Sequence, residues 1–106
     1  MGLFDSEKYD LSDCDETDVM AICAALTVAG KSIDDRVDLS AISSAQKKLN
    51  GGRRKLTERE FKITIASVLA LLALLEDKKK KGESDSDLDS VRNMLQSAAK
   101  ALAELA

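Results

Sequence analysis

Residues 56–81, LTEREFKITIASVLALLALLEDKKKK, decide the fold of this 106-residue chain. The stretch begins with a capping box, in which Thr57 and Glu60 can each satisfy a free backbone N–H group. Four lysines fill its last turn, where cations favour the negative end of the helix dipole, and a helix-ending glycine follows them. The pattern predicts one helix from Glu58 to about Lys81, roughly 36 Å long.

This predicted helix has a very wide apolar surface. On a helical wheel, one narrow side is the natural solvent face, which carries Arg59, Lys62, Ala66, Ala70, Ala73 and Asp77. One flank makes a good core face, with Phe61, Ile65, Val68, Leu69 and Leu72. The other flank carries Ile63, Leu71 and Leu74, interrupted by Ser67. The apolar arc exceeds roughly 200°, whereas an ordinary bundle helix needs an arc of little more than about 100°.

The surplus flank has two interpretations. In the first, the long helix is the central element of the bundle, and the N-terminal arm and the other helices cover it. In the second, the flank is a contact surface for another subunit or a partner, formed by Ile63, Leu71 and Leu74 with Met20 and Val28 of the first helix. Because monomers seldom leave such a patch exposed, the second interpretation predicts a homodimer or an obligate complex.

Three further helices are predicted around the long one. Their ranges are about Glu16 or Asp18 to Ala29, about Asp35 to Leu49, and from near Ser86 onward. Gly30 and Asn50-Gly51-Gly52 are expected to end the first two, because these residues tolerate positive φ. The last helix has a clean packing seam at Leu88, Val91, Leu95, Ala98, Leu102 and Leu105.

The composition also favours helices, because the chain has no proline and only five glycines, whereas all-β chains need these residues at many turns. An acidic arm, residues 1–16, is expected to dock on the body rather than float free, since it carries Leu3, Phe4, Tyr9 and Leu11. We therefore predict a single all-α domain over residues 1–106. It is a small bundle of about four helices, residues 17–106, with an ordered N-terminal arm.

The residue types do not indicate an enzyme or a metal site. Histidine, the commonest general base and transition-metal ligand, is absent. Cys14 and Cys23 match no zinc spacing and form no disulfide framework, so we expect no cofactor, no metal and a reducing, cytoplasmic location. The longest wholly apolar run, Val68 to Leu75, has eight residues, whereas a membrane span needs about twenty.

A basic loop precedes the long helix. Five positive charges lie within residues 47–55, among them Arg53, Arg54 and Lys55. This position, next to a helix N-terminus, suits an acidic partner segment or a phosphate group. The basic loop also allows the hypothesis that this is a nucleic-acid-associated protein. The net charge of −3 and the lack of an exposed aromatic platform count against that hypothesis. A third hypothesis is an acidic mimic of nucleic acid that acts through residues 5–18.

Together these patterns favour a non-catalytic protein–protein interaction module, such as a small regulator, inhibitor or assembly subunit. It would act through hydrophobic helix faces and a divided charge surface, which orients a partner. The predicted apolar contacts are Ile63, Leu71 and Leu74, and the predicted polar contacts are Arg53, Arg54 and Lys55. The expected partner is a protein, whereas nucleic acid is a less favoured partner and a membrane is not expected.

Overall fold

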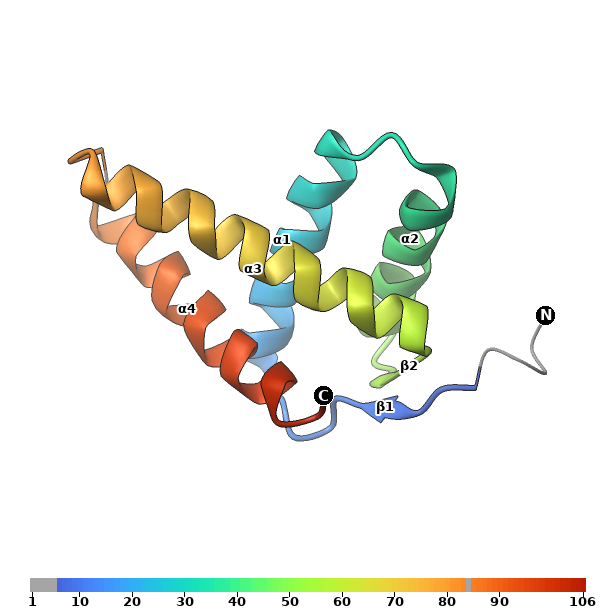
Figure 1. Cartoon of the computed structure of the whole chain (residues 1–106). Coiled ribbons are helices and arrows are strands. Elements are labelled where there is room, and N and C mark those ends of the chain that lie inside the picture. The colour runs from blue at the N-terminus through green and yellow to red at the C-terminus, as the bar shows by residue number, and fades with distance from the viewer. Residues whose placement is uncertain (1–5, 84) are drawn as a thin grey trace.

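The computed structural model describes residues 6–83 and 85–106, which form four helices and two short strands (Figure 1). The helices are α1 (Glu16–Ser32), α2 (Arg36–Asn50), α3 (Glu58–Lys80) and α4 (Ser86–Ala103). The strands, β1 (Tyr9–Asp10) and β2 (Lys55–Leu56), pair antiparallel. The predicted all-α bundle of four helices is therefore confirmed.

The central element is α3, which packs against each of the other three helices. In Figure 1, α4 returns antiparallel beside the C-terminal half of α3, and α2 lies beside its N-terminal half. The predicted capping box is present: Glu60 N–H donates to Thr57 Oγ1 at 3.2 Å, and Thr57 N–H donates to Glu60 Oε1 at 2.8 Å. With its first turn fixed in this way, α3 extends for 23 residues.

The predicted end of α1 at Ala29 is wrong, because the helix continues through Gly30 to Ser32. Gly30 does not adopt positive φ, and the N–H of Ile33 still donates to the C=O of Ala29 at 3.1 Å. A Cβ atom on Gly30 would lie 3.8 Å from the side chain of Ile42 in α2. Glycine permits a helix to end but does not require it, and here α1 continues while it packs against α2.

The acidic arm docks on the body through β1, a strand that no sequence pattern predicted. Tyr9 pairs with β2, and its ring stacks on Phe61 with the two ring centroids 4.0 Å apart. The side chain of Leu11 is fully buried. Strands of two residues carry no periodicity, so the sequence gives no sign of this pairing. The prediction of an ordered arm is confirmed for residues 6–15, whereas its part in residues 1–5 lies outside the described residues.

One hydrophobic core joins the arm to all four helices. Its largest fully buried aliphatic side chains are Leu11, Ile22, Leu26, Leu56, Val68, Leu95 and Leu102. The predicted packing seam of the last helix is confirmed, since its members are buried or packed against this core, although Leu105 follows the end of α4 at Ala103. The solvent face predicted on α3 is also confirmed, because all its residues are exposed. The core thus leaves one side of α3 uncovered.

Candidate functional site

An apolar groove lies between the C-terminal half of α1 and the middle of α3. We call it the α1–α3 groove, and its volume is about 320 Å³. Its lining is Ala25, Val28, Ala29, Ser32, Ile33, Ile63, Ala66, Ser67, Ala70, Leu71 and Leu74. None of these side chains is charged, and the Ser67 hydroxyl already donates to the C=O of Ile63 at 2.6 Å. The groove therefore offers a partner an almost wholly apolar surface.

The three predicted apolar contact residues all line the α1–α3 groove. Ile63 and Leu71 are partly buried against the core, whereas Leu74 is 47% exposed. Val28 of α1 also lines the groove and is 40% exposed, but the exposed Met20 does not contribute to it. The first interpretation of the sequence would require the arm and the other helices to enclose the surplus flank of α3. They leave part of it uncovered.

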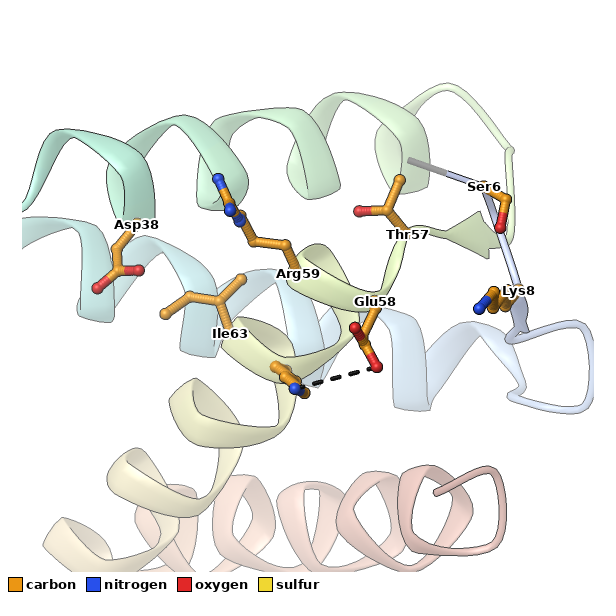
Figure 2. A pocket seen from close by; sticks show the side chains of 8 residues that line it. Ser6, Lys8, Asp38, Thr57, Glu58, Arg59 and Ile63 are labelled. Atoms are coloured by element: carbon orange, nitrogen blue, oxygen red, sulfur yellow. Dashed lines mark ion pairs between the residues drawn. The ribbon is translucent and has the colours of Figure 1, made fainter. Parts of the chain in front are cut away.

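A polar pocket adjoins the α1–α3 groove at Ile63, which lines both. The pocket has a volume of about 440 Å³, and its lining is Ser6, Lys8, Asp38, Thr57, Glu58, Arg59, Lys62 and Ile63. Figure 2 shows Arg59 and Ile63 reaching from α3 toward α2, where Asp38 lies. The dashed line in Figure 2 is the ion pair between Lys62 and Glu58, at 4.0 Å. Charged groups of both signs therefore stand at one end of the apolar groove.

The exposed side of α3 connects the α1–α3 groove to a second apolar groove. This α3–α4 groove has a volume of about 220 Å³, and its lining is Ile65, Val68, Leu69, Ala99, Leu102, Ala103 and Ala106. Between the grooves runs an exposed row that we call the α3 strip: Lys62, Ala66, Leu69, Ala70, Ala73 and Asp77. Since residues 63–75 carry no charge, the surface between the ends of the strip is uncharged.

The prediction that Leu69 belongs to the core is wrong, because this side chain is 51% exposed. Leu69 lies at the border between the predicted core flank and the solvent face of α3. The neighbouring positions in the α3–α4 groove are largely alanines of α4, Ala99 and Ala103 among them. Their small side chains leave the groove open beside Leu69, so an apolar side chain joins the exposed strip.

The basic loop before α3 is largely held by contacts within the chain. Arg53 pairs with Glu7 at 3.1 Å, and Arg54 donates to the C=O of Leu49 at 3.1 Å and to that of Arg53 at 2.8 Å. Lys55 is exposed in β2. The structure nevertheless brings the three predicted polar contact residues together in the lining of one open pocket of about 390 Å³, which they share with Glu7 and Asp10. This pocket lies away from the lining of the α1–α3 groove.

A network around Lys48 has no counterpart in the sequence patterns. The Lys48 ammonium group pairs with Glu60 at 2.7 Å and also with Glu7, and the Ser44 hydroxyl donates to Glu60. Burial acts to raise the pKa of Glu60, but hydrogen bonds from Lys48, Ser44 and the Thr57 backbone hold that pKa below its ordinary value. The capping box identified Glu60, but no local signal connects it to Lys48 or to the arm.

This network predicts that the fold loses stability in acid. The hydrogen bond from Lys48 lowers the pKa of Glu7, and the pKa of Glu60 also lies below the ordinary carboxyl value of 4.5. A carboxyl group with a lowered folded-state pKa stabilises the fold fully above its unfolded-state pKa and loses that contribution as the pH falls through its folded-state pKa. We expect the free energy of unfolding, measured by urea titration, to fall as the pH drops below 4.5. The fall should be smaller in Glu60→Gln, and an equal fall would contradict this assignment.

The two thiols are poor candidates for catalysis. Burial, together with the nearby Asp18 carboxylate, raises the pKa of Cys14 to about 11, so this thiol stays protonated at neutral pH. Burial also raises the pKa of Cys23. Asp18 is itself buried and accepts a hydrogen bond from Ser97 Oγ at 2.7 Å, which joins the start of α1 to α4. Over residues 6–83 and 85–106, no group of three or more Asp, Glu, Cys or His side chains is placed to hold a metal ion.

No protein-family model, curated protein or solved structure matches this chain. In the part of the chain that the structure describes, no helix combines the length and the apolar character that crossing a membrane requires.

Proposed function

We propose that this protein is a non-catalytic protein–protein interaction module whose docking surface is the α1–α3 groove together with the α3 strip. The observation that carries the proposal is an uncharged groove in which Val28 and Leu74 remain about half exposed. Monomeric proteins seldom leave a contiguous apolar surface uncovered, and such surfaces mark sites of protein interaction. The partner presents the apolar face of a helix to this surface.

The polar pocket gives the docking surface a direction. Lys8, Arg59 and Lys62 supply three positive charges, while Asp38 and Glu58 supply two negative charges, which leaves one positive charge in excess at the Ile63 end of the groove. Charged groups beside an apolar surface steer a partner and fix its orientation more than they add affinity. A partner helix therefore fits with a carboxylate side chain placed opposite Lys62 at the polar pocket.

The ion pairs of the arm favour a protein partner over nucleic acid. Binding to nucleic acid requires basic side chains that are free to contact phosphates, but Lys48 and Arg53 both pair with Glu7. An acidic mimic of nucleic acid requires carboxylates that face outward. Glu7 is paired and Asp18 is buried, which leaves Asp10, Asp13, Asp15 and Glu16 exposed. The charged groups of residues 5–18 and 47–55 thus serve partly to hold the arm on the body.

The two cysteines support the non-catalytic part of the proposal. Both thiols have raised pKa values, whereas a nucleophilic cysteine needs a lowered one. Cys14 and Cys23 are also free of any disulfide, which suits a reducing compartment such as the cytoplasm. We therefore place the module in the cytoplasm.

A photoreactive benzophenone amino acid at the position of Leu74 tests the docking surface. The experiment uses the full chain in the cells that make it naturally. Irradiation should join position 74 to a protein and give a discrete product of higher mass, because the side chain stands at the rim of the apolar groove. Gel electrophoresis with mass spectrometry identifies the product. Nuclease treatment should leave it unchanged.

The matched control places the same amino acid at Asn93, an exposed position of α4 outside both apolar grooves. Position 93 should give no discrete product. Equal products from positions 74 and 93, or none from position 74, would overturn the proposed function. A product that disappears on nuclease treatment would favour the nucleic-acid hypothesis instead.

A further inference from the structure

We infer that the partner on the α3 strip is a second copy of this chain, whose own α3 lies antiparallel across the strip. This inference rests on the proposed function, since it assigns a partner to the same docking surface. In Figure 1, α1 passes behind α3, so the helices that pack on α3 leave its exposed side accessible to a second molecule. The pattern of residues along that side determines the direction of the second helix.

The α3 strip is nearly symmetric about its midpoint, beside Ala70. Ala66 and Ala73 lie at equal distances from this point along the sequence, and so do Lys62 and Asp77. A two-fold axis through the midpoint pairs each position with its counterpart in an antiparallel second helix. Ala66 of one copy then faces Ala73 of the other, and Lys62 faces Asp77, twice in each dimer. The strip is therefore complementary to itself.

The charges at the ends of the strip select the antiparallel arrangement. A parallel pair would place Lys62 against Lys62 and Asp77 against Asp77, whereas an antiparallel pair opposes unlike charges. Within one chain, Lys62 pairs with Glu58 at 4.0 Å and Asp77 pairs with Lys81 at 3.1 Å. Both are exposed pairs between residues four positions apart, and such pairs are weak enough to be replaced by ion pairs between the two copies. Arg59, which would face the lysines at the far end of α3, is turned toward α2 in Figure 2.

The side chains between these ends suit close helix packing. Three alanines on the strip allow two helix axes to approach toward the short end of the usual range of about 8–10 Å. The two-fold axis places both α1–α3 grooves on the same side of the helix pair. Leu74 of one copy then lies near the Ile63 end of the groove in the other copy. The exposed part of Leu74 therefore has an apolar surface to contact.

Sedimentation equilibrium of the purified full-length chain tests for the second copy. At a concentration of about 100 µM, above the micromolar dissociation constants of weaker interfaces, the mass should be twice the monomer mass of 11.4 kDa. Ala70→Arg places two arginines beside the two-fold axis and should restore the monomer mass. Because Ala70 is exposed, this variant should keep the wild-type circular dichroism spectrum and melting temperature in dilute solution.

An exchange of charges tests the antiparallel direction. Lys62→Glu and Asp77→Lys should each raise the dimer dissociation constant about tenfold, because each change replaces two attractive pairs with two repulsive ones. The double variant should return the dissociation constant close to that of the wild type. Lys47→Glu makes the same change of charge on an exposed residue of α2 and should have no effect. Additive weakening in the double variant would overturn the antiparallel arrangement.

Two results separate this inference from the proposed function. A wild-type mass of one monomer at about 100 µM, or a dimer that Ala70→Arg leaves intact, would overturn the second copy as the partner. If position 74 nevertheless cross-links to a different protein in cells, the proposed function stands without the dimer. If position 74 gives no discrete product at all, the proposed function itself fails.

Discussion

Replacing Leu75 with alanine should lower the free energy of unfolding by about 3 kcal/mol, because the change leaves a cavity in the core. Leu75 is only 5% exposed and belongs to the cluster of side chains shared by the arm and the helices. The measurement is urea denaturation followed by circular dichroism. It should be made at a protein concentration low enough for the monomer to dominate, so that loss of a partner does not contribute.

The neighbouring leucine is the matched control, because Leu74→Ala removes the same atoms from the same helix. Leu74 is 47% exposed in the α1–α3 groove, so its truncation should lower the free energy of unfolding by less than about 1 kcal/mol. The same variant should weaken binding at the docking surface. Equal losses of stability at the two positions would show that the groove side of α3 is part of the core, which would contradict the proposed docking surface.

The second large effect is expected at Glu60, where alanine should lower the free energy of unfolding by about 3 kcal/mol. This substitution removes one half of the capping box and takes a partner from the mostly buried Lys48 and from the Ser44 hydroxyl. The ion pair between Lys48 and Glu7 remains, which limits the loss. Thermal and urea unfolding of the purified variant measure it.

Glu58→Ala is the control for this prediction, since both residues lie in the first turn of α3. The Glu58 side chain is 62% exposed and pairs with the exposed Lys62 at 4.0 Å. Its loss should change the free energy of unfolding by no more than about 0.5 kcal/mol, as for other exposed ion pairs. A similar effect at both positions would show that the helix dipole, rather than the buried network, accounts for the contribution of Glu60.

Much of the fold could be predicted from local signals. The capping box at Thr57 fixed the start of α3, and Asp35 and the glycines after Asn50 set the bounds of α2. Signals of this kind involve residues within about one turn of helix, so the amino-acid sequence alone is enough to recognise them. The end of α1 was missed because Gly30 is held inside the helix, and β1 was missed because its pairing with β2 depends on contacts far apart in sequence.

The candidate site was predictable only in part. The helical wheel correctly separated the solvent face of α3 from its flanks, and it placed Ile63 and Leu74 on the side that became the α1–α3 groove. It could not determine how far α4 covers the border residue Leu69. Nor could it show that Glu7, 41 positions before Lys48, would pair with it, because such a contact follows from the docking of the arm.

The hydrogen bond from Ser97 to Asp18 has a consequence for how the chain assembles on the ribosome. Asp18, which carries the carboxylate, is synthesised first. Ser97, whose hydroxyl donates to that carboxylate, is synthesised 79 residues later. The burial of the inner face of α1 is therefore complete only after α4 has been synthesised. Closure of the bundle thus follows the synthesis of α4, and nascent chains released before Ser97 lack the hydroxyl that joins α4 to the start of α1.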